Sequence, residues 1–165
     1  MGMDLVPRNP IKGFHANWSG WSTLQVLLHF LDQDITHMDG ANNGHRVSAK
    51  DAKKWAKAVR EAVEKKSLMI VNTYDPTYED DTKDWIIPTA KKEEFEAIAK
   101  RVQKSKKIRL ATSPLEVYLA MVFATRRKLP HRNAVQGYEK FKKADADWLL
   151  RFADFCEKSS GFSQC

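Results

Sequence analysis

The chain has 165 residues, of which 42% are hydrophobic, so it can fill one core without disulfide or metal staples. Its net charge of +7 favours an acidic or polyanionic partner, although such a charge is also common in small domains that bind no nucleic acid. No apolar run reaches the length of about 18 residues that a membrane span needs, and the start of the chain lacks a signal-peptide segment. Cys156 and Cys165 offer no disulfide framework. These features predict a single domain over residues 1–165, located in the cytoplasm and not associated with a membrane.

The first 18 residues are expected to be extended, because Pro7 and Pro10 keep the backbone out of a helix. A first helix is predicted to begin between Ser19 and Ser22, with Ser22 as its N-cap and Gln25 at the reciprocal capping position. Its apolar stripe consists of Trp21, Leu24, Leu27, Leu28 and Leu31.

Residues 32–46 are predicted to form a loop that contains an Asn43-Gly44 turn. A second helix follows, capped by Ser48 with Asp51 three residues later. Its apolar face consists of Ala52, Trp55, Val59 and Val63.

The middle of the chain is the only part with strand character. Residues 67–74 are rich in β-branched and aromatic side chains, and residues 84–88 are a suitable partner strand. A third helix is predicted over 90–104, and a fourth begins with Ser113 as N-cap and Pro114 at the first helical position.

The last helix is predicted to run from about Arg132 to Lys158. Its apolar stripe consists of Tyr138, Phe141, Trp148, Phe152 and Phe155, and Asp145 is the single polar residue on the same face. Gly161 is expected to take the left-handed conformation after the helix, which would fold Phe162 back onto the last turn. The predicted fold is therefore mainly α, a single-domain bundle of about five helices with one short strand pair at about 67–74 and 84–88.

No strong signature of catalysis or of cofactor binding is present. The five histidines are scattered, and there is no CxxC. Residues 39–44 resemble the start of a calcium loop, but Ala41 and Lys50 stand where oxygen ligands are required, so a turn is the better interpretation. The acidic segment 75–84 is expected to be a solvated loop rather than an ion site. A nucleophile elbow and a Walker loop are also missing, so we expect no metal, no cofactor and no catalytic residue.

The segment 14–21, FHANWSGW, is the most unusual part of the sequence. One interpretation is structural, because tryptophans beside a helix start usually anchor it on the core. The other is that His15, Asn17 and the two indole N–H groups line a cleft, since binding sites prefer aromatic walls with few polar groups. The candidate binding residues, taken together with the Asn-Gly loop and a basic segment, are His15, Asn17, Trp18, Asn42, Asn43, Arg126 and Arg127.

The basic runs at 104–109 and 126–132 are the best argument for nucleic acid as a partner. Against it, no helix carries Arg, Asn and Gln at base-reading positions, and the same charges can dock an acidic protein surface.

Several segments together resemble a set of small, uncharacterised bacterial and phage proteins. They are PRNP near the start, FHANWSGW, NNGHRVSA and the terminal WLLRFADFCEKSSGFSQC. The set shares an FxxNxxGW-like segment and a GFxxC-like tail, and the resemblance does not extend to residues 66–130. It implies a cytoplasmic protein of bacterial or mobile-element origin that acts by binding.

The sequence therefore favours a non-enzymatic binding protein whose partner is a protein or a small ligand. A basic nucleic-acid-binding accessory protein is the alternative, and an enzyme acting on a small substrate ranks third.

Overall fold

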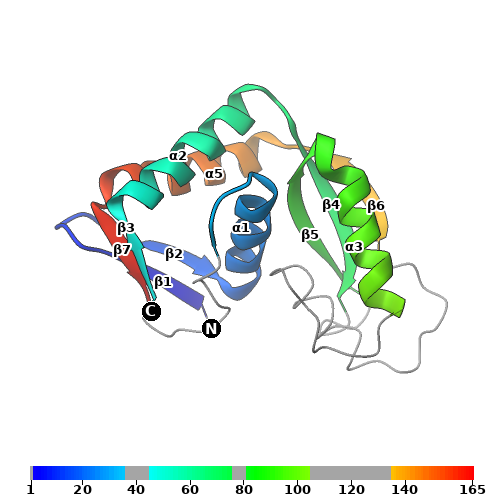
Figure 1. Ribbon diagram of the computed structural model, residues 1–165, viewed down its shortest axis with the longest axis horizontal. Coiled ribbons are helices and arrows are strands. Elements are labelled where there is room, and N and C mark those ends of the chain that lie inside the picture. Colours follow the sequence, from blue (N-terminus) through cyan, green and yellow to red (C-terminus); the bar gives the residue numbers. More distant parts are fainter. Residues whose placement is uncertain (1, 36–44, 76–80, 105–134) are drawn as a thin grey trace.

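The computed structural model describes residues 2–35, 45–75, 81–104 and 135–165 (Figure 1). Within these ranges, four α-helices and seven strands form two antiparallel sheets, so the expected mainly α bundle is wrong and the fold is of the α/β type. In chain order the elements are β1 (Gly2–Pro7), β2 (Phe14–Asn17), α1 (Trp18–Phe30), β3 (Arg46–Ser48), α2 (Ala49–Glu64), β4 (Leu68–Asp75), β5 (Asp81–Pro88), a 3₁₀ turn (Thr89–Lys91), α3 (Lys92–Lys104), β6 (Val135–Lys140), α5 (Lys143–Lys158) and β7 (Gly161–Gln164).

Sheet A joins the two ends of the chain in the order β2-β1-β7-β3. The tail strand β7 is central, with Leu5 opposite Gln164 on one side and Val47 opposite Phe162 on the other. Asp4 and Cys165 exchange two backbone hydrogen bonds of 2.9 and 2.8 Å. The sequence indicates extended backbone near the start but not this sheet, because its strands are three to six residues long and are paired across the whole chain.

Sheet B has the order β5-β4-β6. The strand pair expected at 67–74 and 84–88 is present as β4 and β5, which pair from Leu68↔Pro88 to Asp75↔Asp81. Residues 81–84, expected in a loop, therefore belong to a strand. Residues 76–80 of the acidic segment and the helix predicted from Ser113 lie outside the described residues.

The predicted start of the last helix is also wrong. Residues 135–140 form β6, which pairs with β4 through Val71↔Tyr138, and α5 begins only at Lys143. The spacing of Tyr138 and Phe141 is compatible with a helix, but two aromatic residues are too few to distinguish a period of 3.6 from one of 2. Asp145 is therefore not a polar exception on a buried helix face. It lies at the start of α5, where its carboxylate accepts a hydrogen bond from the backbone N–H of Lys142 (3.3 Å).

Helix α1 is shared by two hydrophobic cores. Leu24, Leu27 and Leu28 belong to the core between sheet A, α2 and α5, whereas Val26 and Phe30 belong to the core of sheet B and α3. A helix that is apolar on most sides has to be buried on most sides. The single apolar stripe predicted for this helix therefore describes only half of its contacts, and α1 holds the two sheets together (Figure 1).

Helices α2 and α5 lie together over sheet A (Figure 1). The guanidinium of Arg60 on α2 contacts the carboxylates of Asp154 and Glu157 on α5, each at 2.6 Å. These acidic partners raise the pKa of Arg60. The N-cap predicted for α2 is confirmed, since the hydroxyl of Ser48 accepts a hydrogen bond from the N–H of Asp51 (3.0 Å).

The tail follows the predicted geometry but not the predicted role. Gly161 takes a positive φ of 89°, and Phe162 is fully buried with its ring centroid 5.2 Å from that of Phe155. The residues after the helix are therefore not merely a cap, because they continue as the central strand of sheet A. On α5, Cys156 is a free, buried cysteine, and burial raises the pKa of its thiol. Across the described ranges, no helix combines the length and apolar character needed to cross a membrane.

Candidate ligand-binding pocket

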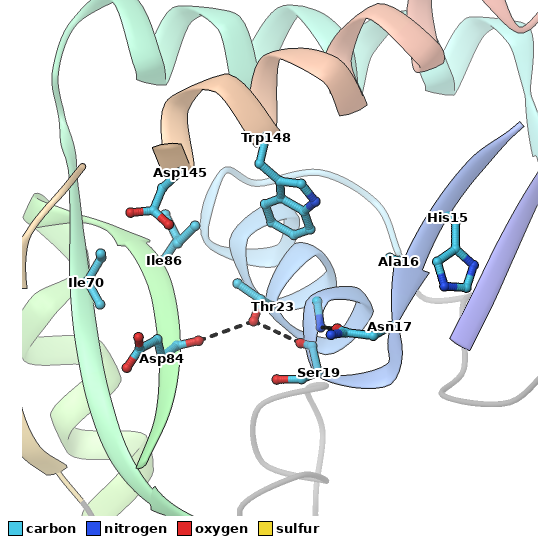
Figure 2. A pocket seen from close by; sticks show the side chains of 11 residues that line it. His15, Ala16, Asn17, Ser19, Thr23, Ile70, Asp84, Ile86, Asp145 and Trp148 are labelled. Carbon is cyan, nitrogen blue, oxygen red and sulfur yellow. Dashed lines mark hydrogen bonds between the residues drawn. The ribbon is translucent and has the colours of Figure 1, made fainter. Parts of the chain in front are cut away.

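A cavity of about 580 Å³ lies at the start of α1, between the two sheets and below the first turns of α5 (Figure 2). Five elements supply its walls, although their residues are far apart in the sequence. The lining residues are His15, Ala16, Asn17, Ser19, Gly20, Thr23, Ile70, Asp84, Ile86, Asp145 and Trp148.

The FHANWSGW segment forms the wall on the sheet A side, and Asn17 fixes its course. The Asn17 side chain accepts a hydrogen bond from the N–H of Gly20 (2.7 Å), so α1 begins at Trp18. The predicted cap, Ser22, already lies inside the helix. Sequence analysis missed this cap because the Ser22–Gln25 pattern competes with it and the asparagine has no glutamate or glutamine three residues later.

The aromatic and glycine residues of the segment pack it onto α5. Phe14 contacts Phe152 edge-on, with ring centroids 5.5 Å apart. A Cβ on Gly20 would lie 3.2 Å from the Trp148 ring, so the absence of a side chain allows this ring to approach the helix start. Trp21 points into the core and is 1% exposed. The segment therefore divides into anchors such as Phe14 and Trp21 and pocket-lining residues such as His15 and Asn17, and the expectation that the indole of Trp21 lines a cleft is wrong.

Trp148 supplies the aromatic wall. It lies on the second turn of α5 and its indole ring points down into the cavity (Figure 2). The sequence places Trp148 on the buried stripe of the last helix, but it is only partly buried because the cavity lies beneath it. Tryptophan walls with a few directed polar groups are common in ligand sites.

The opposite wall comes from sheet B, with Ile70 and Ile86 between two carboxylates (Figure 2). Asp84 on β5 accepts a hydrogen bond from the Asn72 side chain on β4 (2.6 Å). Asp145, at the start of α5, is held by its capping hydrogen bond. Both carboxylates are therefore fixed in direction by neighbouring groups.

A buried lysine lies below the cavity and ties α1 to β5. Lys83 is only 3% exposed, and its ammonium group donates hydrogen bonds of 2.7 Å to both the carbonyl and the hydroxyl of Ser19. It also lies 4.5 Å from the centre of the Trp85 ring. In addition, the Thr23 hydroxyl donates to the carbonyls of Ser19 (3.0 Å) and Asp84 (3.3 Å).

The contact between Ser19 and Lys83 resembles a serine–lysine catalytic pair, in which the lysine acts as a general base only as an unprotonated amine. Burial favours the neutral amine, whereas the carbonyl acceptor and the aromatic face favour the ammonium form, so this contact alone assigns no catalytic role. The Nδ1 of His15 pairs with the carboxylate of Asp4 (2.6 Å), and among the described residues no hydrogen bond joins His15 to the Ser19 hydroxyl. The described residues also contain no group of three or more metal-binding side chains.

The residues proposed from the sequence are only partly brought together. His15 and Asn17 line the pocket, and the backbone of Trp18 forms the first residue of α1. The side chain of Trp18 lies outside the described residues, as do Asn42, Asn43, Arg126 and Arg127. Sequence reasoning missed the pocket residues Thr23, Asp84, Asp145 and Trp148. The one available signal was the polar Asp145 among apolar residues.

Comparison of the chain with protein-family profiles, curated protein sequences and solved structures finds no match.

The Asn17 cap should be measurable in stability. Replacing Asn17 by alanine should lower the free energy of unfolding by about 1 kcal/mol, because the N–H of Gly20 loses its acceptor. Asn17→Asp keeps an acceptor at the same position and should be close to the wild type. Urea unfolding of both variants measures the difference. Equal losses for alanine and aspartate would show that the side chain does not act as a cap.

Proposed function

We propose that this is a non-enzymatic, cytoplasmic binding protein, and that the pocket at the start of α1 receives a small ligand or a side chain of a partner protein. One observation carries the proposal: groups from both sheets, α1 and α5 converge on a cavity of about 580 Å³ with an indole wall. This volume is in the range of about 300–1,000 Å³ that is common for small-molecule sites. An aromatic and aliphatic lining with a few oriented polar groups suits binding.

The alternative, a nucleic-acid-binding protein, receives no support from this pocket. Phosphate groups are recognised by cationic side chains and free N–H donors. The lining instead carries the carboxylates of Asp84 and Asp145, and the N–H of Gly20 is already bound by Asn17. Nucleic-acid binding would therefore have to use another surface. A gel shift at low salt tests nucleic-acid binding. If Asp84→Lys leaves the gel shift unchanged, the nucleic acid binds to a surface away from the pocket.

A fragment screen by NMR tests the proposed site. In ¹⁵N-labelled protein, fragments that enter the pocket should shift the backbone amide of Gly20 and the indole N–H of Trp148. In Trp148→Ala the fragment-induced shift of the Gly20 amide should be lost, because the aromatic wall is missing.

Tyr138→Ala is the matched control, since Tyr138 is an exposed aromatic residue on β6 that does not line the pocket. It should leave fragment binding unchanged. A library that produces no shifts around the pocket at millimolar concentration would contradict the proposed function.

A further inference from the structure

We infer that the group recognised in this pocket is an organic cation on an apolar stem, with a guanidinium group as the best fit. The inference rests on the proposed function, because it names the chemistry of the ligand for the same pocket. The carrying observation is the combination of two unpaired carboxylates with an aromatic wall in one cavity.

The charge of the lining is opposite to that of the chain. The chain carries a net charge of +7, yet among the described residues that line the cavity there is no lysine or arginine. Asp84 and Asp145 are the carboxylates there, and neither lies within ion-pair distance of a basic side chain in the described ranges. Lys83 is close by, but it is buried behind Ser19, and the carbonyl and hydroxyl of that residue already bind its ammonium group.

Each carboxylate keeps one oxygen for a ligand. Asp84 uses Oδ1 for the Asn72 side chain, and Asp145 uses Oδ2 for the backbone N–H of Lys142. In the described part of the chain, Oδ2 of Asp84 and Oδ1 of Asp145 accept no hydrogen bond. The bound oxygen limits the direction of each carboxylate, and each unbound oxygen can accept from an N–H donor of a guanidinium.

The remaining walls suit the stem and the flat face of such a ligand. Trp148 offers an indole ring, and cations prefer tryptophan among the aromatic faces. Ile70 and Ile86 lie between the two carboxylates on the sheet B side (Figure 2) and can cover methylene groups. A guanidinium is planar and weakly hydrated, so it loses less hydration free energy than an ammonium when it stacks in a partly apolar site.

The start of α1 does not reverse this preference. A helix N-terminus attracts anions through its unpaired N–H groups and its dipole. Here the Asn17 side chain already accepts from the N–H of Gly20. The dipole is equivalent to about half a charge, whereas the described lining carries two carboxylates.

Matched peptides test the inference. Titrate the ¹⁵N-labelled protein with acetyl-Gly-Arg-Gly-amide and with the same peptide containing citrulline, which has the shape of arginine without its charge. The arginine peptide should shift Trp148 and Gly20 and bind at least about tenfold more tightly than the citrulline peptide, because hydrogen bonds to charged groups are the stronger ones. Butylguanidine, which carries a guanidinium on an apolar stem and no second charge, forms a third arm. Binding of butylguanidine equal to that of the peptide identifies a small molecule as the source of the cation, and tighter binding of the peptide identifies a partner protein.

Asp84→Asn and Asp145→Asn should each weaken binding of the arginine peptide about tenfold, since each removes one charge but keeps an acceptor oxygen. Asp147→Asn is the matched control, because Asp147 is exposed on the same helix and does not line the cavity. Thermal unfolding of each variant shows that it is folded. Equal binding of arginine and citrulline peptides, or no effect of either asparagine substitution, overturns the inference. Fragments that enter the pocket without preferring a cation would refute it while leaving the proposed function intact.

Discussion

Replacing Phe162 by alanine should lower the free energy of unfolding by about 3–5 kcal/mol. The ring is fully buried in the central strand of sheet A, and its centroid lies 6.0 Å from that of Trp55 and 5.2 Å from that of Phe155. Truncation would leave a cavity where sheet A meets the two covering helices. Since a domain is commonly stable by only about 5–15 kcal/mol, much of the total would be lost. Urea unfolding, followed by circular dichroism, measures this change in the free energy of unfolding.

Val6→Ala is the control for this substitution. Val6 lies in β1 opposite Ser163, so it belongs to the same sheet, but its side chain is 47% exposed. This substitution should lower the free energy of unfolding by less than about 1 kcal/mol, because a mostly exposed side chain buries little apolar surface. If both substitutions cost the same, β7 does not occupy the buried central position.

Gly161→Ala should cost about 2–5 kcal/mol for a different reason. Gly161 has a φ of 89°, a conformation that is strained for any residue with a Cβ. A Cβ at this position would also lie 2.7 Å from the carbonyl oxygen of Val47 and 3.0 Å from the backbone nitrogen of Ala49. Backbone atoms cannot move away as a side chain could, so strain and overpacking add. Urea unfolding is again the measurement.

Gly137→Ala is the matched control. Gly137 lies in β6, an edge strand of sheet B, and the nearest atom to an added Cβ is Asn72 Oδ1 at 3.5 Å, an ordinary contact. This substitution should change the unfolding free energy by less than about 1 kcal/mol. A small effect of Gly161→Ala would mean that the chain can leave α5 and enter β7 without the left-handed residue.

Local signals predicted local structure well. The cap at Ser48, the apolar face of α2 and the left-handed Gly161 each depend on neighbours within a few residues, and the structure contains all three. The strand pair β4–β5 was also predicted, because both strands carry a dense β-branched and aromatic pattern.

Sheet A could not be predicted in the same way. Its strands are three to six residues long, too short for a periodic signal, and β7 pairs with β1 across most of the sequence. For residues 135–155 the sequence predicted too much helix. The aromatic residues there have a helical spacing, but residues 135–140 form strand β6. Tertiary pairing with β4 overrides that local pattern.

The pocket was predicted only in part, because most of its residues are brought together by long-range contacts. The FHANWSGW segment was distinctive by composition, and His15 and Asn17 do line the cavity. Asp84, Asp145 and Trp148 come from sheet B and α5, and no spacing in the sequence connects them to that segment. The resemblance to small bacterial and phage proteins stays a prediction. In this chain, Phe14, Asn17, Gly20 and Trp21 have structural roles that account for an FxxNxxGW pattern.

The pairing of β1 with β7 sets an order of events during synthesis. The ribosome makes residues 2–7 early, but their central partner, residues 161–164, emerges almost 160 residues later. Until then β1 can pair only with β2, and the opposite edge of that hairpin stays open to other extended chains. Because long-range pairings form slowly, β1 gains its second neighbour only after residues 161–164 have been made. A nascent chain stalled before Gly161 should therefore be more prone to aggregation than a chain that includes β7.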